Sequence, residues 1–439
     1  MEKETNNKKM FRNSYNNSRP GGRFSRSDDN RVGRSRFGGG NRGQGRPSFH
    51  RGGHNFPVGR GSRGRGRGGH KGTYIDVARF VKKAVITEEV AVFVPEHLFK
   101  DFHIDEQLKK NVVTKGYTTP TPIQDKVIPH ILRGEDVVGI ANTGTGKTAA
   151  FLVPLINKVL HDRKENILII VPTRELAIQI NQELKDFTKG MKIFSVCCVG
   201  GAPIGAQIRE LRYHNNFIIG TPGRLKDLVE RKFINLATFN TIVLDEADRM
   251  LDMGFLPDMK LLIAEMPKSR HALFFSATIS REIESLIKDF MGAPVRVSVK
   301  TQDTPTNVDQ DIIRLKPGEE KIKILQKLLS QTEFTKVLIF GRTKYGVERL
   351  SKTLTGLGFK AEAIHGNKNL NGRQRSLSMF KGNQVGILVA TDVAARGLDI
   401  PNVSHVINYD TPATFEDYVH RIGRTGRGDK RGKALTFVE

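Results

Sequence analysis

The chain has 439 residues, which is too long for one small core and suits two domains with an additional segment. Its composition is ordinary for a globular protein, no apolar run reaches the roughly 18 residues that cross a bilayer, and the N-terminus lacks a secretory stretch, so we expect an intracellular protein without a membrane span. The net charge of +25 favours a polyanionic partner, nucleic acid first and an anionic membrane second.

Residues 1–72 form an Arg/Gly-rich segment that holds 17 of the 44 glycines and 18 Lys or Arg against 4 acidic residues. Such a segment buries too little apolar surface to offset its ordering entropy, so we expect a disordered tail. Arginines spaced by glycine, with Phe24 and Phe37 among the interleaved aromatics, can follow phosphates and stack on bases without sequence preference. We favour RNA contact over a purely solubilising tail. Residues 73–95 form a pre-core segment.

From about residue 96, short apolar runs alternate with helical stretches such as ELAIQINQELKDF, which is typical of parallel sheets covered by helices. The first lobe, residues 96–299, has strand candidates DVVGI, NILIIVP, IFSVCCV, NFIIG, TIVLDE, HALFFSA and VRVSV. The second lobe, residues 310–439, has QDIIRL, KVLIF, KAEAIH, GILVATD, HVINYD and KALTFVE. Residues 300–309 are polar and aperiodic, so we expect a flexible linker. The sequence predicts an α/β fold of two tandem parallel-sheet lobes.

A glycine-containing loop, ANTGTGKT at 141–148, follows the strand DVVGI and precedes an apolar helical stretch. Gly144 and Gly146 let backbone N–H groups turn toward phosphate oxygens, and the helix adds its positive N-terminal end. Lys147 would reach the β and γ phosphates, and Thr148 would ligate Mg²⁺. The strict pattern has Gly where this chain has Ala141, so the loop alone does not decide. Every loop position is expected to contact ATP, namely Ala141, Asn142, Thr143, Gly144, Thr145, Gly146, Lys147 and Thr148.

The only two cysteines, Cys197 and Cys198, are adjacent within an apolar stretch. Neighbours on a strand point to opposite faces and cannot easily bridge, and no second cluster offers metal ligands. We therefore interpret both as buried strand residues.

An acidic segment, DEAD, ends the apolar strand TIVL about 100 residues after the loop. Carboxylates at the carboxyl end of a parallel strand lie beside the ligand crevice. Asp245 can hold Mg²⁺ through water, and Glu246 can orient or deprotonate the attacking water. An isolated DEAD would more often be a solvated acidic turn, but the preceding strand and the phosphate loop favour the metal interpretation.

Further segments occur in a fixed order along residues 96–439. Besides ANTGTGKT and DEAD, these are FKDFHI with GYTTPTPIQ, PTRELAIQI, the pair GG at 200–201, TPGRL, SAT, LIFGRTK, TDVAARGLDI and HRIGRTGR. The set closely resembles the DEAD-box RNA helicases of helicase superfamily 2, which implies two RecA-like lobes. The family usually continues past ALTFVE into another helix, so we expect a truncated second lobe.

The resemblance extends to the base and to the lobe interface. Gln124 offers the donor and acceptor needed to read an adenine edge, which favours ATP over GTP, and the resemblance implies that Phe99 stacks on that base. Ser276 and Thr278 could hydrogen-bond the DEAD carboxylates, Asp248 included, and so link the nucleotide to the lobe interface. A simple strand-capping role for both hydroxyls stays open.

The second lobe supplies the remaining nucleotide contacts. The resemblance places Arg424 and Arg427 as arginine fingers on the γ-phosphate, with the catalytic candidate His420 in the same segment, Asp399 near the ribose and Gly397 as a further ATP-binding residue. Such fingers contribute several orders of magnitude in rate. A plain basic surface turn is the weaker interpretation. Because the loop and the fingers lie in different lobes, hydrolysis should require lobe closure.

The resemblance also implies RNA contacts in both lobes. Small residues permit close backbone approach to phosphates and ribose hydroxyls, while arginines neutralise charge, so binding should not depend on RNA sequence. Leu370 stands where the family usually has Gln, which puts that polar contact in doubt. The expected RNA-binding residues are Pro172, Thr173, Arg174, Gly200, Gly201, Thr221, Arg224, Gly366, Arg373 and Thr391.

The expected activity is RNA-stimulated ATP hydrolysis, with ATP and Mg²⁺, coupled to local and non-processive unwinding or remodelling of RNA. A nucleotide-gated RNA clamp or condensate scaffold is the alternative, and a DNA helicase ranks below both. We expect a monomeric core in the cytoplasm, with the nucleus open if the source is eukaryotic. The sequence does not identify the RNA, the pathway or a protein partner.

Overall fold

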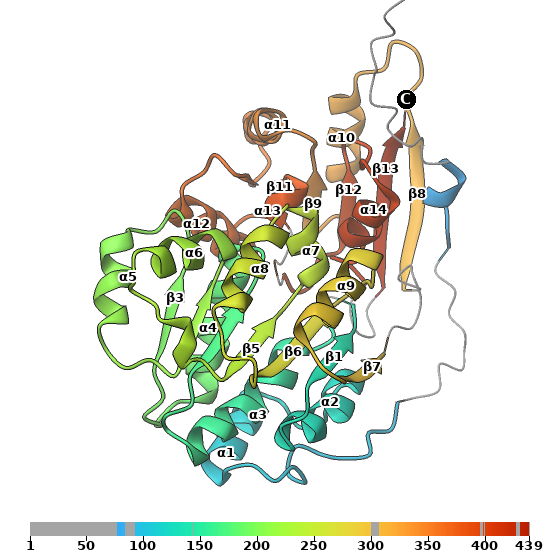
Figure 1. The fold of residues 1–439 in the computed structure, drawn as a ribbon. Helices are drawn as coiled ribbons and strands as arrows, with labels where there is room; N and C mark the ends of the chain where they lie inside the picture. Colours follow the sequence, from blue (N-terminus) through green and yellow to red (C-terminus); the bar gives the residue numbers. More distant parts are fainter. Residues whose placement is uncertain are drawn as a thin grey trace, which may run out of the picture. The chain divides into compact units, whose positions relative to one another are not determined.

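The computed structural model describes residues 77–83, 93–142, 144–299, 307–395, 398, 400–426 and 431–438. The predicted tail, residues 1–72, lies outside them, as do Thr143, Gly397, Asp399 and Arg427. Two sheets make up the fold (Figure 1), and every pairing between their described strands is parallel. The predicted α/β class with two parallel-sheet lobes is therefore confirmed.

The first sheet has the strand order β3-β4-β2-β5-β6-β1-β7 and the second β10-β11-β9-β12-β13-β8. The first contains β1 (Val137–Ile140), β2 (Ile167–Ile170), β3 (Ser195–Cys198), β4 (Phe217–Gly220), β5 (Thr241–Leu244), β6 (His271–Ser276) and β7 (Val295–Ser298). The second contains β8 (Val308–Arg314), β9 (Val337–Phe340), β10 (Ala361–Ile364), β11 (Ile387–Ala390), β12 (His405–Asn408) and β13 (Gly432–Val438).

Helices connect successive strands in both lobes. In the first lobe they are α1 (Glu106–Thr114), α2 (Pro122–Leu132), α3 (Lys147–His161), α4 (Arg174–Phe187), α5 (Ile204–Leu211), α6 (Pro222–Glu230), α7 (Ala247–Asp252), α8 (Leu256–Ala264) and α9 (Arg281–Phe290). In the second they are α10 (Lys321–Leu329), α11 (Lys344–Gly356), α12 (Leu370–Lys381), α13 (Asp392–Ala395) and α14 (Phe415–Ile422). Short 3-10 helices occupy Val77–Phe80 (η1) and Leu236–Thr238 (η2). Among the described helices, none is both long and apolar enough to span a membrane.

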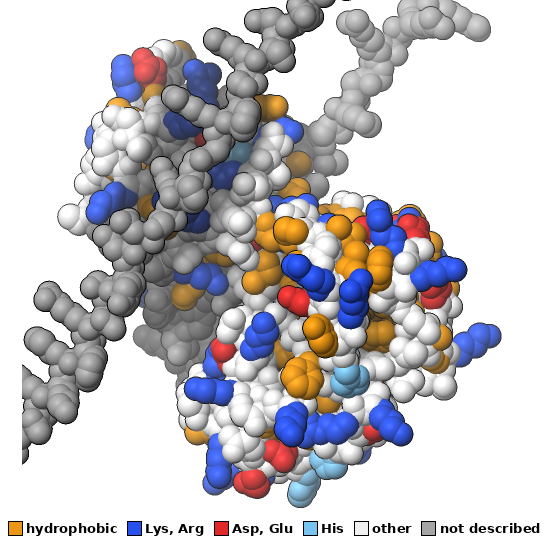
Figure 2. All heavy atoms as spheres, turned by 90° about the vertical axis from the view of Figure 1, so that its left-hand side faces the viewer, with side chains coloured by type: hydrophobic (Ala, Val, Ile, Leu, Met, Phe, Trp, Pro, Cys, Tyr) orange, Lys and Arg blue, Asp and Glu red, His pale blue; other side chains and the backbone are white. Residues whose placement is uncertain are grey.

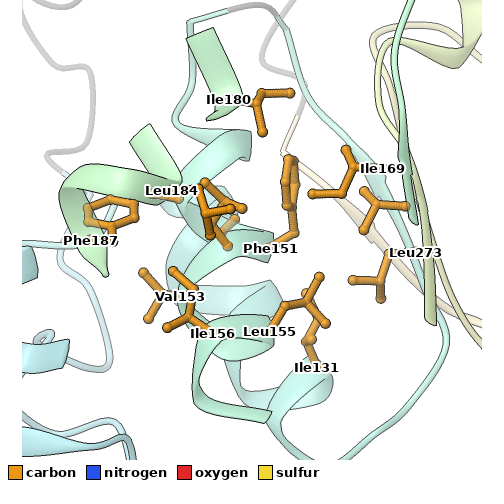
Figure 3. Close-up of a cluster of buried hydrophobic side chains, with 14 of the residues drawn as sticks. Ile131, Phe151, Val153, Leu155, Ile156, Ile169, Ile180, Leu184, Phe187 and Leu273 are labelled. Atoms are coloured by element: carbon orange, nitrogen blue, oxygen red, sulfur yellow. The ribbon is translucent and has the colours of Figure 1, made fainter. Parts of the chain in front are cut away.

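Alternate strand residues of the first sheet point into two separate cores. One core joins β-strand residues such as Ile169 and Leu273 to helices α1 to α4, and the other joins Leu168 and Phe274 to α6 through α9. Figure 3 shows the first core, with Phe151 of α3 lying between the strand side chains and Leu184 of α4. Burial on both faces explains why β2, β4 and β5 are buried along their whole length and, apart from Thr241 of β5, carry no polar side chain.

The second sheet likewise separates two cores. One contains Leu338, Leu388 and Tyr418, while the other contains Ile339, Val389 and helices α10 and α11. The packed sheet therefore fixes the positions of its strand ends, and the loops that follow these ends carry functional residues.

The structure bears on three further expectations, which concern the two cysteines, the linker and the pre-core segment. Cys198 is buried and Cys197 is partly buried on β3, and both are free thiols whose pKa is raised by burial. The expected linker, residues 300–309, overlaps the start of β8 at Val308, because Val308 is fully buried in the second-lobe core. The expected pre-core segment contains η1, which contacts the second lobe.

Candidate active site

The phosphate loop and the acidic segment meet at one edge of the first sheet. Strands β5, β6 and β1 are neighbours, and their carboxyl ends lead into Asp245, Ala277 and Ala141 respectively. Because parallel strands end at the same edge, residues far apart in sequence share one crevice there.

The loop turns into α3 at Gly146, whose φ of 90° favours glycine. Gln124 Nε2 donates to the Gly146 carbonyl at 3.0 Å, and Thr121 Oγ1 donates to the Thr145 carbonyl at 2.8 Å. A Cβ at Gly146 would overlap the Gln124 amide. The start of α2 thus braces the loop, and the two segments form one structural unit.

Lys147 begins α3 and is only 6% exposed. Its Nζ donates to the Ala141 carbonyl at 2.8 Å, so the ammonium lies over the loop at the positive end of a 15-residue helix. An ammonium has three donors, which leaves capacity for an anion. Thr148, half-buried, is the next residue of the helix. These features fit a phosphate group.

The two carboxylates after β5 are both buried, Asp245 at 2% and Glu246 at 5% exposure. Glu246 has a φ of 53°, which is uncommon for a residue with a side chain and is the kind of strain found at functional positions. Its N–H donates to Asp245 Oδ1 at 2.9 Å, and its Oε2 accepts from Arg249 Nη1 at 3.1 Å. The strained turn therefore fixes both carboxylates at the strand end.

The electrostatics of this turn suit a cation. Burial raises the pKa of Asp245 to about 6, with Glu246 and Asp248 adding to the rise and Lys147 opposing it. A magnesium ion beside Asp245 would offset this crowding of negative charge. Among the described residues, no group of three His, Cys, Asp or Glu side chains is placed to hold a metal ion.

Asp248 connects the acidic segment to the loop after β6. Its Oδ2 accepts from the N–H groups of Ala277 and Thr278, each at 3.0 Å, and from Thr278 Oγ1 at 3.2 Å. Burial opposes its ionisation, but Arg249, Lys147, His420 and the Thr278 N–H together hold its pKa below the usual value. The expected contact of Ser276 with these carboxylates is wrong in this structure, because Ser276 Oγ donates to the Thr278 carbonyl at 2.7 Å.

These residues line a cavity of about 460 Å³. Lys147, Asp245 and Glu246 contribute from the first lobe, and Leu398 and Arg424 contribute from the second. Sequence reasoning missed several further lining residues, although one of them, Tyr117, lies inside the quoted GYTTPTPIQ segment. The polar and charged residues among those missed are Lys115, Tyr117, Gln179, Gln182, Glu183 and Lys381.

Two family models match the chain, DEAD/DEAH box helicase over residues 121–286 and Helicase conserved C-terminal domain over residues 320–429. ATP-dependent RNA helicase CshA of Limosilactobacillus reuteri is 45% identical over 343 residues, covering 77% of this chain and 69% of that protein. CshA of Listeria monocytogenes is 44% identical over 345 residues, covering 78% and 66%. The chain belongs to the DEAD-box family of ATP-dependent RNA helicases. It spans about two thirds of the length of these two relatives.

A solved structure shares this fold. The fold is similar to S. cerevisiae Dbp5 bound to RNA and ADP BeF3, with a TM-score of 0.68, 29% identity, and coverage of 78% of this chain and 89% of that chain. The expected recognition from sequence is thus confirmed.

In this DEAD-box helicase the structure describes only some of the second-lobe residues that were expected at the nucleotide, and Arg424 is the one of them that lines the cavity. Arg424 is 3% exposed, and its Nη1 donates to the Leu398 carbonyl at 2.7 Å. His420 is close enough to Asp248 to affect that carboxyl's pKa. The roles of Arg427, Gly397 and Asp399 stay predictions, since these residues lie outside the described part.

Phe99 and Gln124, the two residues expected to bind the adenine base, are both buried. Phe99 is 1% exposed and packs edge-on against Phe102 and Tyr117, so its ring belongs to the first-lobe core and supports Tyr117, which lines the cavity. Stacking of Phe99 on adenine stays a prediction. Gln124 is fully buried and already bonds the Gly146 carbonyl and the Thr121 N–H, so adenine reading by Gln124 stays a prediction.

The expected RNA-binding residues of the first lobe share the other half of the sheet edge. They follow β2, β4 and β3, which are neighbours in the sheet. A Cβ at Gly201, where φ is 77°, would overlap the Arg174 guanidinium, so the glycine pair makes room for that arginine. The expected RNA-binding residues at this half of the edge are Pro172, Thr173, Arg174, Gly200, Gly201, Thr221 and Arg224. Figure 2 shows Lys and Arg side chains spread over one face of the molecule.

The expected RNA-binding residues of the second lobe lie in two different environments. Gly366 and Thr391 follow the neighbouring strands β10 and β11, and the Thr391 N–H donates to the Ile364 carbonyl. Arg373 is instead 8% exposed, and its Nη2 donates to Glu175 Oε2 of the first lobe at 2.9 Å. A buried ion pair thus engages the Arg373 guanidinium in this structure, and RNA contact by Arg373 stays a prediction.

Asp245→Asn should stabilise the ligand-free protein at neutral pH. The native pKa of about 6 exceeds the ordinary 3.8, so between these pH values the native state holds a proton that the unfolded chain has lost. The unfolding free energy of wild type should therefore fall as pH rises through this window, by up to about 3 kcal/mol. Chemical unfolding at pH 4 and pH 7.5 measures this, with Asp289→Asn as an exposed control. Equal pH dependence in wild type and Asp245→Asn would contradict the buried-carboxylate account.

Arg421→Ala should destabilise the second lobe by about 3–5 kcal/mol. Arg421 is 2% exposed, contacts Asp392 at 2.5 and 2.8 Å, and donates to the Asp410 carbonyl at 2.7 Å, so its loss leaves a partly buried carboxylate uncompensated. Urea unfolding measures the change, with the exposed Arg349→Ala as the control. A loss under about 1 kcal/mol, the value of a surface pair, would show that the pair is solvated.

Proposed function

We propose that this chain hydrolyses ATP when RNA is bound, and couples that hydrolysis to local, non-processive separation or remodelling of RNA. The observation that carries the proposal is the shared cavity, because Lys147 and Glu246 of the first lobe and Arg424 of the second line it together. Its volume of about 460 Å³ is within the usual range for a small-molecule site.

The residues around the cavity suggest a division of roles. Lys147, at the positive end of α3, would hold the β and γ phosphates of ATP. Glu246 would orient the attacking water and accept its proton, while Arg424 would stabilise the negative charge that develops on the transferred phosphoryl group. Thr148 and Asp245 would hold Mg²⁺, which neutralises phosphate charge when bound.

RNA binding would be coupled to this chemistry through the sheet edge. The two halves of that edge belong to one rigid sheet, with the nucleotide at β5, β6 and β1 and the proposed RNA contacts at β3, β4 and β2. Glycines and threonines at strand ends suit phosphate and ribose rather than bases, so we propose binding without sequence preference. Dbp5, bound to RNA and ADP BeF3, offers a precedent for both ligands together.

We also propose a monomeric core that acts in the cytoplasm. One chain already supplies residues from both lobes to the cavity, so a second copy is not needed to complete it. The bacterial source of the two CshA relatives supports the cytoplasmic part of the proposal.

Phosphate release tests the proposed activity. The full chain is assayed with ATP alone, with single-stranded RNA, and with single-stranded DNA of the same length and sequence. RNA should stimulate release at least about tenfold, and DNA should not, since ribose hydroxyls are part of the proposed contact. Turnover that needs no nucleic acid, or equal stimulation by DNA, would reject it.

A further inference from the structure

The amino ends of three neighbouring strands carry a basic and aromatic surface that the proposed function does not use. Strands β3, β4 and β2 are adjacent in the first sheet, and residues 191–194, 212–216 and 162–166 are the loops that lead into them. The expected RNA contacts of this lobe lie at the opposite, carboxyl ends of the same strands. The exposed basic and aromatic side chains of the three loops, here named the amino-end patch, are Arg163, Lys164, Lys192, Phe194, Arg212 and Tyr213.

One buried side chain joins the three loops. Asn216 is 1% exposed, and its Oδ1 accepts from the Phe194 N–H at 3.3 Å. Its Nδ2 donates to the Arg163 carbonyl at 3.1 Å and lies 3.1 Å from His214 Nε2. Arg163 Nη1 in turn donates to the Lys192 carbonyl at 3.1 Å. The backbones that carry the patch are therefore held together by hydrogen bonds.

Two aromatic rings of the patch are open to solvent. Phe194 is 54% exposed and Tyr213 is 77% exposed. β3, which follows Phe194, is the first strand in the sheet order, so its outer side has no neighbouring strand among those described. Exposed rings beside cations are the combination on which single-stranded nucleic acids stack their bases, and such stacking tolerates any sequence because every base has a π-face.

The charge of the patch suits a polyanion. Four of its six members are Lys or Arg, and Asp162 is the one exposed carboxylate among the described residues of the three loops. The other acidic residue, Glu165, is buried, and its Oε1 accepts from Lys158 Nζ at 2.8 Å and from Thr241 Oγ1 at 2.6 Å. Figure 2 shows Lys and Arg side chains beside apolar ones on the side where α5 and β3 lie in Figure 1. An acidic peptide would use these cations but has no bases to stack on the rings.

We propose that the amino-end patch is a second site for single-stranded RNA, where bases stack on Phe194 and Tyr213. Lys192 and Arg212 neutralise the phosphates of the same strand. The inference rests on the proposed function in taking RNA as the ligand. Gly200 is six residues after Phe194, which at about 3.3 Å per residue is up to about 20 Å. Phosphates follow one another at about 3.4 Å along one strand, so RNA at the carboxyl-end contacts must extend by about six nucleotides to reach the patch.

A length series of RNA tests the two rings in the full chain. Fluorescence anisotropy with a non-hydrolysable ATP analogue compares an unstructured RNA of about 10 nucleotides with the same RNA extended by about 10 nucleotides at its 5′ or its 3′ end. Phe194→Ala with Tyr213→Ala should weaken binding of one extended RNA about tenfold and leave binding of the short RNA unchanged. Phe194→Tyr with Tyr213→Phe keeps both rings and should match wild type. All variants keep residues 1–72, so any contribution of that segment is common to them.

The cations give an independent readout. Lys192→Gln with Arg212→Gln should lower the slope of log affinity against log salt by about 1.4 for the same extended RNA, because each phosphate contact on a single strand contributes about 0.7. The slope for the short RNA should not change. Lys268→Gln, an exposed lysine before β6 at the same end of the sheet, is the control outside the patch and should leave both slopes as in wild type.

Three results would overturn the patch as an RNA site. These are wild-type binding of every RNA by the double alanine variant, an equal loss for short and extended RNAs, and poly-glutamate that binds wild type but not this variant. The last result would assign the patch to an acidic protein. Phosphate release stimulated by the short RNA tests the proposed function alone. Its absence would reject that function, while the binding comparison still decides the patch.

Discussion

Glu246→Gln should lower the turnover number about 1,000-fold while leaving ATP binding nearly unchanged. The amide keeps the size of the side chain but cannot accept a proton from the attacking water. Glu246 suits that role because it is 5% exposed, lines the cavity and is fixed by its contact with Arg249 at 3.1 Å.

Single-turnover hydrolysis and equilibrium binding of a fluorescent ATP analogue separate the two effects. Glu282→Gln, an exposed glutamate on α9, is the matched control and should retain wild-type turnover. A Glu246→Gln protein that keeps more than about a tenth of the activity would remove Glu246 from the chemical step.

Arg424→Lys should also lower turnover by about 1,000-fold, with the RNA-free unfolding midpoint little changed. Arg424 reaches the cavity while its Nη1 donates to the Leu398 carbonyl at 2.7 Å. A guanidinium presents separate N–H groups in a rigid planar fork, so it can hold that carbonyl with one group and face a phosphoryl group with another, whereas a lysine ammonium is a compact point charge that does not reproduce this fork.

The comparison is again kinetic, under saturating ATP and single-stranded RNA. Arg349→Lys, an exposed position on α11, is the control. If Arg424→Lys keeps turnover within a few-fold of wild type, the second lobe does not supply transition-state charge from this residue.

Much of the fold could be predicted because the strands are short apolar runs. Parallel strands buried on both faces need apolar residues at successive positions, and each described strand falls within or overlaps a segment predicted from this pattern. The order of the strands in the sheets could not be predicted in this way. For example, β3 is paired with β4 and not with β2, and no local sequence pattern encodes that pairing.

The site could be predicted as a set of motifs but less well as a set of contacts. Gln124 lies three residues after Thr121 at the start of α2, a spacing typical of a helix N-terminal capping box, and its Oε1 accepts from the Thr121 N–H at 2.9 Å. That signal was available in the sequence and explains why Gln124 is turned toward the phosphate loop.

Other contacts had no local signal. Arg373 and Glu175 are 198 residues apart, and their pairing depends on tertiary structure that motif spacing does not encode. Phe80 lies in a short segment with several apolar residues, YIDVARFVKKAVI, but such a pattern does not indicate which lobe the segment packs against. Side-chain rotamers such as that of Ser276 are likewise decided by close packing and not by sequence pattern.

The central claim is that ATP and RNA together bring the two lobes around one triphosphate. The most direct test is the distance between spin labels at Glu106→Cys and Lys352→Cys. Pulsed electron paramagnetic resonance measures it with a non-hydrolysable ATP analogue and single-stranded RNA. The account predicts one narrow, short-distance population that requires both ligands. A distribution that stays broad and unchanged with both ligands bound would contradict it.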